Sequence, residues 1–266
     1  MSKNIYVNAI DPVLEVSNLT VIRSGDTVIE DASFVINRGE YVGIVGPNGG
    51  GKTTLLLALL GILSPKTGNI RLFKENIKSF AHWERIAYIA QDAINFDAHF
   101  PLTVRELVGL GRLQPAKLGH PLDNHDWQVV DKVLSYMDLT DISSRRIGEL
   151  SGGQKQRIFV AKALVRNPDI LFLDEPITGI DATVQETFFK KLSDLNTQKG
   201  ITIIIVSHDL AAVFCRMSTV ICVNREVHKA SITNRLEPNE ILRKAYGDHF
   251  HFVFHQHNCA GAFNHE

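Results

Sequence analysis

Long hydrophobic runs are missing from this sequence of 266 residues. No apolar stretch approaches the roughly 20 consecutive apolar residues that a membrane-spanning helix requires. Residues 1–11 also lack the apolar middle section of a signal peptide. We therefore expect a protein that stays in the cytoplasm.

The sequence also has few cysteines and a small net charge. The three cysteines, Cys215, Cys222 and Cys259, are odd in number and show no C-x-x-C spacing. This fits a reducing compartment and argues against a disulfide framework. The formal net charge at pH 7 is -1, so the chain has no broad basic field for holding nucleic acid. We expect no nucleic-acid partner.

Short apolar runs of strand length recur along the chain, at residues 41–45, 86–90, 170–173 and 201–206. Nearly continuous apolar runs are typical of strands buried on both faces of a parallel sheet, with helices between them. Residues 13–36 instead alternate partly between apolar and polar and contain the turn Ser24-Gly25-Asp26, which predicts an antiparallel pair of strands. The predicted fold class is α/β, with a mixed, mostly parallel sheet and an antiparallel β edge.

Residues 92–150 follow a helical pattern. Helices are predicted near 104–111 and 126–137, with prolines at their boundaries. This predicts a helical subdomain inserted into the α/β core. A last helix is expected over 238–246, after the strand pattern fades beyond Val223. The predicted division is a core in two parts, 1–91 and 151–246, a helical subdomain, 92–150, and a histidine-rich tail, 247–266.

A glycine-rich stretch follows the predicted strand 41–45 and precedes an apolar helix that begins near Lys52. It satisfies the pattern G-x4-G-K-[ST] of phosphate-binding loops and consists of Gly46, Pro47, Asn48, Gly49, Gly50, Gly51, Lys52 and Thr53. Glycines let successive backbone N–H groups face phosphate oxygens, and the helix N-terminus adds its positive end. We expect Lys52 to neutralise the transferred phosphate and Thr53 to hold Mg²⁺. Thr54 is added to the nucleotide-binding set.

The apolar run at 170–173 ends in two acids, Asp174 and Glu175, before Pro176. Adjacent acids are often only solvated, but this pair follows a buried strand. A carboxylate at that position binds Mg²⁺ directly or through water in phosphate-transferring ATPases. We therefore expect Asp174 to bind Mg²⁺ and Glu175 to lie beside the terminal phosphate.

The motif Leu150-Ser151-Gly152-Gly153-Gln154 resembles the signature of ABC-type ATPases. Other motifs of that family follow the same order along the chain: Gln91 resembles its Q-loop, Asp181 its D-loop and His208 its switch histidine. The resemblance spans about 13–246. It implies that Glu175 orients or deprotonates the attacking water, that His208 contacts the terminal phosphate, and that Gln91 senses Mg²⁺ and water.

The resemblance also implies partners. Two copies of the chain would form a head-to-tail homodimer, with each ATP between the Lys52 loop of one copy and the Ser151 loop of the other. Gly152, Gly153 and Gln154 belong to that second anion site, which suits a helix N-terminus. An integral membrane permease subunit and an extracytoplasmic substrate-binding protein complete the expected transporter. The chain would then lie at the cytoplasmic face of the membrane.

Arg23 is a departure from the family pattern, which usually places an aromatic residue there to stack on adenine. A guanidinium can stack on the base, or Arg23 is a solvated surface residue. The two interpretations are weighed evenly, so preference for ATP over GTP stays open.

Two stretches bear on the transported substrate. Residues 96–108, with Gly111-Arg112 after them, and residues 175–181 resemble the ATPases of zinc and manganese importers. The expected function is therefore ATP hydrolysis that powers import of a divalent metal. The alternatives are the ATPase of an iron-chelate or haem importer and a soluble ABC protein of translation or DNA repair. Soluble members generally carry two cassettes or a long coiled coil, and this sequence has neither.

The last eighteen residues are rich in metal-ligating side chains: His249, His251, His255, His257, Cys259 and His265. Imidazole and thiolate groups are suitable zinc ligands. The hypothesis is a zinc-sensing regulatory tail. The alternative, at even weight, is a terminus that binds metal only weakly.

Overall fold

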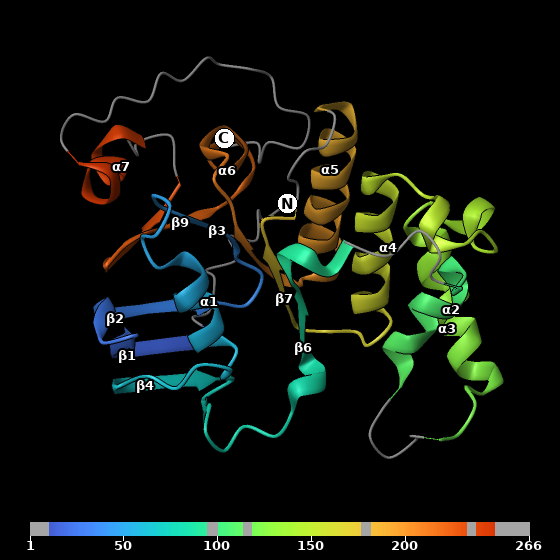
Figure 1. Cartoon of the computed structure of the whole chain (residues 1–266), viewed down its shortest axis with the longest axis horizontal. Coiled ribbons are helices and arrows are strands. Elements are labelled where there is room, and N and C mark those ends of the chain that lie inside the picture. Colours follow the sequence, from blue (N-terminus) through green and yellow to red (C-terminus); the bar gives the residue numbers. More distant parts are fainter. Residues whose placement is uncertain (1–10, 95–100, 114–118, 177–181, 233–237, 248–266) are drawn as a thin grey trace, which may run out of the picture.

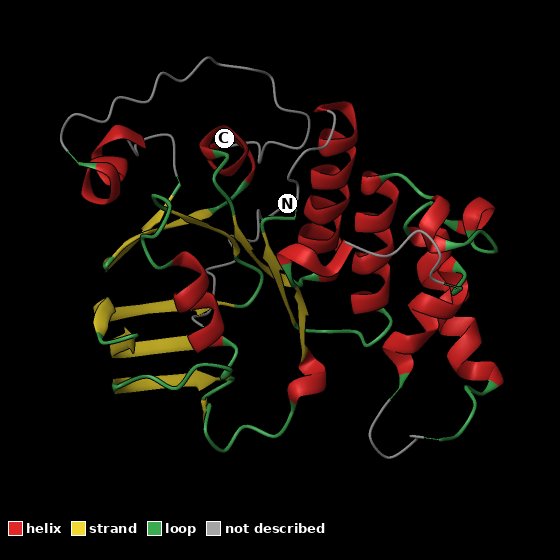
Figure 2. Cartoon of the chain, in the orientation of Figure 1, coloured by secondary structure: helices red, strands yellow, loops and turns green. Residues whose placement is uncertain are grey.

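The structure is a computed structural model that describes residues 11–94, 101–113, 119–176, 182–232 and 238–247. Its described elements form two β-sheets with helices packed between and beside them (Figures 1 and 2). None of the helices in these segments is long and apolar enough to cross a membrane.

The larger sheet has six strands in the order β10-β9-β3-β8-β7-β6. Their bounds are Tyr41–Val45 for β3, Ile86–Ile89 for β6, Ile170–Asp174 for β7, Thr202–Val206 for β8, Thr219–Asn224 for β9 and Glu226–Ser231 for β10. Strands β6, β7, β8, β3 and β9 are parallel, and β10 is antiparallel at one edge. The four apolar runs seen in the sequence are thus confirmed as parallel strands.

The smaller sheet is antiparallel, with the order β2-β1-β4-β5. Its strands are Pro12–Arg23 (β1), Asp26–Asn37 (β2), Thr67–Leu72 (β4) and Glu75–Asn76 (β5). The predicted pair of strands is present as β1 and β2, but it does not continue the parallel sheet. Because β1 pairs with β2 on one side and β4 on the other, the hairpin forms the centre of a separate sheet. An isolated bridge between Ile29 and Arg225 connects it to the larger one.

Strand β10 is a correction to the sequence analysis, which expected the strand pattern to fade after Val223. It pairs with β9 along six residues, from Glu226–Asn224 to Ser231–Thr219. Only two of its six residues, Val227 and Ala230, are apolar, and the strand lies at the sheet edge, so it has no continuous apolar run in the sequence.

Helix α1, Lys52–Leu59, lies between the two sheets (Figure 1). Its buried leucines pack with Val42, Ile44 and Phe172 of the larger sheet and with the apolar face of the smaller sheet. Successive strand residues point to opposite faces, so Val45, Leu171 and Ile203 face the other core. That core contains α4, Gly152–Leu164; α5, Ala182–Lys199; α6, Leu210–Arg216; and α7, Pro238–Tyr246. The α7 bounds confirm the predicted last helix.

Two further helices, α2 (Val104–Gly109) and α3 (Asn124–Tyr136), pack near α4 at one end of the molecule (Figure 1). Both start with capping boxes, Thr103 with Glu106 and Asp123 with Asp126, in which each N-cap side chain satisfies a free N–H group. Because Asp123 is the cap, α3 starts two residues before the predicted start. The predicted domain boundaries stay a prediction.

Short 3₁₀ turns connect these elements: η1 (Trp83–Arg85), η2 (Gln91–Ile94), η3 (Leu110–Arg112), η5 (Thr140–Ile142) and η6 (Ile147–Glu149). At Gly111 in η3, an added Cβ would lie 2.2 Å from the carbonyl oxygen of Lys162. The backbone of η3 therefore packs directly against α4.

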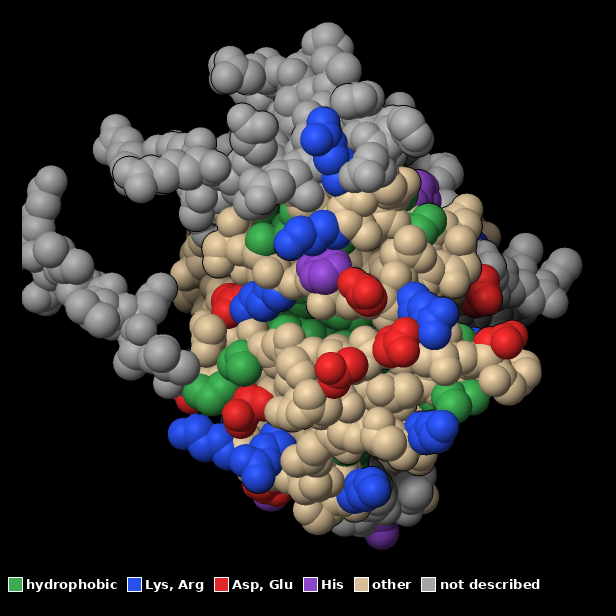
Figure 3. Space-filling view, turned by 90° about the vertical axis from the view of Figure 1, so that its left-hand side faces the viewer, with side chains coloured by type: hydrophobic (Ala, Val, Ile, Leu, Met, Phe, Trp, Pro, Cys, Tyr) green, Lys and Arg blue, Asp and Glu red, His purple; other side chains and the backbone are tan. Residues whose placement is uncertain are grey.

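The face that carries the smaller sheet is shown in Figure 3. Its Lys, Arg, Asp and Glu side chains are interspersed, without a field of a single sign. Where β2, β3 and β10 meet, a half-buried ion pair joins Lys229 Nζ to Glu40 Oε2 at 2.8 Å. Glu40 also accepts hydrogen bonds from the Asn37 backbone and side chain and from Thr219 Oγ1. Burial raises the pKa of Glu40, but Lys229 and Asn37 outweigh it and hold that pKa below its ordinary value.

Replacing Glu40 by Gln is expected to make the free energy of unfolding depend less on pH in the acid range. A carboxyl whose folded-state pKa is depressed stabilises the fold above its unfolded pKa, near 4.5. That contribution is lost as the pH falls through the folded value. Urea unfolding at pH 7 and at pH values below 4.5 should therefore show a gap between wild type and Glu40→Gln that shrinks in acid. The exposed Glu75→Gln is the control, and a pH-independent gap would contradict the prediction.

Candidate functional site

The glycine-rich loop lies between β3 and α1, as expected. Gly46 has φ 157°, and a Cβ there would lie 1.9 Å from the carbonyl oxygen of Val223. Gly51, the residue before α1, has φ 101°, a conformation that favours glycine. Glycine at these positions therefore lets the loop lie directly on the end of β9 and turn into the helix.

Lys52 is 7% exposed and its Nζ donates to the carbonyl oxygens of Gly46, at 2.9 Å, and Pro47, at 3.0 Å. Burial lowers the pKa of Lys52, while the charges of Glu175 and Asp174 oppose this. The next residue, Thr53, is exposed in the first turn of α1, and Thr54 is buried. The ammonium group thus lies beside the loop and the acids, where a phosphate would meet it.

The acids at the end of β7 differ in environment. Asp174 is 4% exposed, and burial, followed by the negative charge of Glu175, raises its pKa to about 6. Its Oδ1 is buried and has no hydrogen-bond partner among the described residues. An orphaned carboxylate oxygen next to a second carboxylate fits a divalent cation, which prefers oxygen ligands. The residues present therefore fit Mg²⁺.

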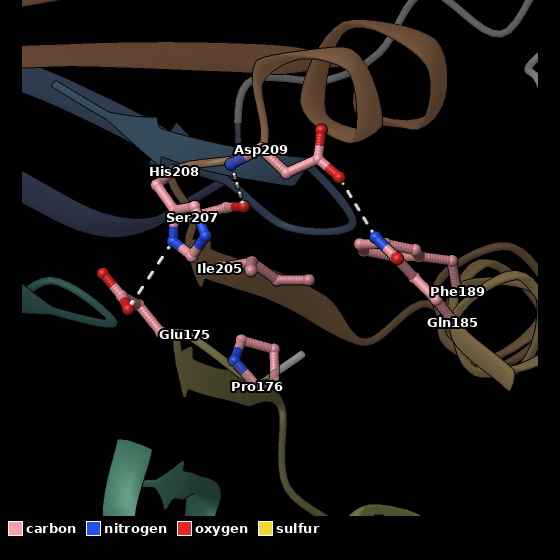
Figure 4. A pocket seen from close by; sticks show the side chains of 8 residues that line it. All are labelled: Glu175, Pro176, Gln185, Phe189, Ile205, Ser207, His208 and Asp209. Carbon is pink, nitrogen blue, oxygen red and sulfur yellow. Dashed lines mark hydrogen bonds and ion pairs between the residues drawn. The ribbon is translucent and has the colours of Figure 1, made fainter. Parts of the chain in front are cut away.

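Glu175 is brought together with two residues that are distant in the sequence. Gln91 Nε2 donates to Glu175 Oε2 at 3.2 Å. His208 Nδ1 lies 3.6 Å from the same oxygen, as Figure 4 shows. Glu175 has φ 44°, and its N–H donates to the carbonyl oxygen of Val206. A non-glycine residue in this left-handed region costs about 1–3 kcal/mol and marks functional sites. Here it places the carboxylate beyond the end of the strand.

A cavity of ≈ 340 Å³ lies beside Glu175 and His208, between β8 and α5. Figure 4 shows Ser207, Asp209 and Gln185 around it. Asp209 caps α6 through the N–H of Ala212 and accepts from Gln185 Nε2 at 3.0 Å. The sequence analysis missed Asp209 and Gln185. Asp209 had a detectable signal, an acid immediately before a helical run, whereas nothing in the sequence connects it to Gln185.

A further acid was also missed. Asp92, which follows Gln91, contributes to the raised pKa of Asp174. It therefore adds negative charge to the candidate cation site, and its adjacency to Gln91 was the available signal.

Ser151 is the N-cap of α4 and forms a capping box with Gln154. The Ser151 hydroxyl oxygen accepts a hydrogen bond from the Gln154 N–H, and the Ser151 N–H donates to Gln154 Oε1. Ser151 and Gly152 are exposed, and Gly153 is buried. Among the described segments, no hydrogen bond or ion pair joins these residues to the Lys52 loop. The two predicted anion-binding elements are therefore separate surfaces of this chain.

Arg23 is the exposed last residue of β1, opposite Asp26 in the register. Asp181 and the tail residues His249, His251, His255, His257 and Cys259 lie outside the described residues.

Comparisons with known proteins identify the family. Residues 29–178 match the ABC transporter family. The zinc uptake system ATP-binding protein ZurA of Listeria innocua is 38% identical over 81% of this chain and 84% of that protein. The manganese transport system ATP-binding protein MntB of Halalkalibacterium halodurans is 35% identical over 89% and 92%. The solved structure of CbiO1 from Clostridium perfringens, part of the ABC transporter complex CbiONQ, has a TM-score of 0.76 and 29% identity over 88% of this chain and 94% of that chain. These matches confirm the resemblance found in the sequence, and the chain belongs to the ABC transporter family.

Proposed function

We propose that this chain is the ATP-hydrolysing subunit of a transporter that imports a divalent metal ion, zinc or manganese. Membership of the ABC transporter family and the names of its zinc and manganese relatives support the proposal. The observation that carries the hydrolytic part is the meeting of Gln91 and His208 on one carboxylate oxygen of Glu175.

ATP binds with its phosphates against the N–H groups of residues 46–54 and against Lys52. Asp174, Thr53 and Gln91 would hold Mg²⁺, which would supply positive charge to the phosphate oxygens. Glu175 accepts a proton from water as the water oxygen bonds to the terminal phosphorus. The bond from that phosphorus to the bridging oxygen then breaks, and ADP and phosphate leave. His208 stabilises charge on the transferred group.

The partner in hydrolysis is a second copy of the chain. The exposed Ser151 and Gly152 start a 13-residue helix whose N-terminal N–H groups favour an anion. Because this element is separate from the Lys52 loop, it binds the terminal phosphate held by the other copy. The resulting head-to-tail homodimer holds two ATP molecules.

The membrane subunit docks in a cavity of ≈ 380 Å³ between β6, η3 and α4. Apolar side chains line it, including Ile86, Leu110 and Leu113, while Lys162 and Arg166 add positive charge. Leu110 is 41% exposed. An amphipathic helix with acidic residues on the permease complements such a surface. The chain then lies at the cytoplasmic face of the membrane, and an extracytoplasmic binding protein delivers the metal.

The histidine-rich tail, which lies outside the described residues, binds zinc and regulates the ATPase. Calorimetry should detect zinc binding by the full chain that is lost on deletion of residues after Asp248. Binding no tighter than millimolar, unchanged by the deletion, would contradict this.

Metal uptake in cells that lack this gene tests the transport function. Uptake of zinc or manganese isotope should fall and be restored by the wild-type gene but not by Lys52→Ala. Unchanged uptake of both metals would contradict divalent-metal import, and loss of iron-chelate uptake in the same cells would identify an iron-chelate importer.

A further inference from the structure

Gln156, on the buried side of α4, has an unusual environment. Its side chain is 4% exposed, and both its amide oxygen and its amide nitrogen are buried without a hydrogen-bond partner in the part of the chain that the structure describes. Buried amides are nearly always hydrogen-bonded, because an unmet donor or acceptor in an apolar environment is unfavourable. Such an exception calls for an explanation in function or strain.

The position of Gln156 points to a function. It lines a small cavity, ≈ 10 Å³, together with Gln91, Pro176, Leu173 and Phe188. This volume is close to the lower limit for a single water molecule, so the cavity has room for at most about one water beside the amide. Among the described residues of the lining, the one side-chain amide besides Gln156 is that of Gln91, whose Nε2 already donates to Glu175.

Gln156 also connects two parts of the site that the sequence keeps apart. It lies on α4, the helix capped by Ser151, and its cavity is bordered by the residues that end β6 and β7. Figure 1 shows α4 running alongside this part of the sheet. A small displacement of α4 on binding the other copy's phosphate would therefore move Gln156 relative to Gln91 and Pro176.

We propose that Gln156 is a positioning residue that couples the Ser151 helix to the hydrolytic site. In the nucleotide-bound homodimer its Nε2 donates to Gln91 Oε1, which fixes the amide of Gln91 so that Gln91 Nε2 points at Glu175. Contact of Ser151 with the second ATP thereby sets the direction of the general base. The amide that lacks a hydrogen-bond partner within the described segments is the feature that this bond satisfies. The inference rests on the proposed ATPase function.

The test is Gln156→Met, which keeps the shape and length of the side chain and removes the amide. The melting temperature of the nucleotide-free chain should rise by about 2–4 °C, because an unmet polar group is removed. In steady-state assays of the full chain, kcat should fall roughly tenfold through misplacement of Gln91, with the KM for ATP unchanged. Gln156→Asn, which keeps an amide, should retain more of kcat than Gln156→Met.

Gln198→Met, the same change at an exposed position of α5, is the control and should leave both quantities unchanged. An unchanged kcat in Gln156→Met would overturn the inference, and so would a fall in kcat accompanied by a lower melting temperature, which indicates a packing role alone. Failure of the wild type to hydrolyse ATP would instead overturn the proposed function on which the inference rests.

Discussion

Glu175→Gln is expected to lower the kcat of ATP hydrolysis by about 10²- to 10⁴-fold, the usual contribution of a general base. The amide keeps the size of the side chain but cannot accept the proton of the attacking water. ATP binding should persist, because Lys52 and the loop N–H groups are unchanged. Loss of the negative charge next to Asp174, which helps to raise the pKa of that acid, also removes a repulsion from the phosphates.

Phosphate release and nucleotide affinity should be measured on the same preparations. The matched control is Glu75→Gln, the same change at an exposed position of β5, which should hydrolyse ATP at the wild-type rate. Steady-state hydrolysis by Glu175→Gln within tenfold of wild type would remove Glu175 from the role of base. The variant should also form an ATP-dependent dimer, visible as a doubled mass in solution.

Lys52→Met is expected to weaken ATP binding by about 10- to 100-fold. Hydrogen bonds to charged groups contribute about 1.5–3 kcal/mol, and about 1.4 kcal/mol corresponds to a tenfold change in affinity. Methionine keeps most of the buried stem of a side chain that is 7% exposed, so the main loss is the ammonium group. The rate of hydrolysis should fall by a larger factor than the affinity, because negative charge develops on the leaving oxygen of ADP in the transition state and the ammonium group stabilises it.

Equilibrium titration with a fluorescent ATP analogue measures the nucleotide affinity separately from the rate of hydrolysis. Lys66→Met, at an exposed lysine before β4, is the control for loss of one positive charge. Equal affinities of Lys52→Met and wild type would exclude Lys52 from the phosphate site. A melting temperature close to wild type is needed for this comparison, since Lys52 also bonds the carbonyl oxygens of Gly46 and Pro47.

The sequence predicted the elements whose signal is local. The glycine loop, the strand before it and the helix after it lie within about twenty residues, and their pattern reflects backbone requirements that operate within that span. The Ser151 cap of α4 is also a local signal. So are the apolar runs of the parallel strands, which indicate burial on both faces of the sheet. The roles of the individual site residues and the domain boundaries remain predictions.

The sequence did not reveal contacts formed by residues far apart in the chain. Gln91 and Glu175 are separated by 84 positions. The residues next to each of them in the sequence give no signal of the contact between the two. Strand β10 was missed because most of its residues are polar and it lies at a sheet edge, so it lacks the continuous apolar run of a buried strand.

By itself, then, the sequence determined the family, the phosphate-binding loop and the four buried parallel strands β3, β6, β7 and β8, because these follow from short-range patterns. Only the tertiary structure decided that β1 and β2 form a separate sheet, that Gln91 and His208 meet at Glu175, and that the amide of Gln156 is buried behind them. Those outcomes depend on how strands pair and helices pack across long sequence distances, which no local pattern encodes.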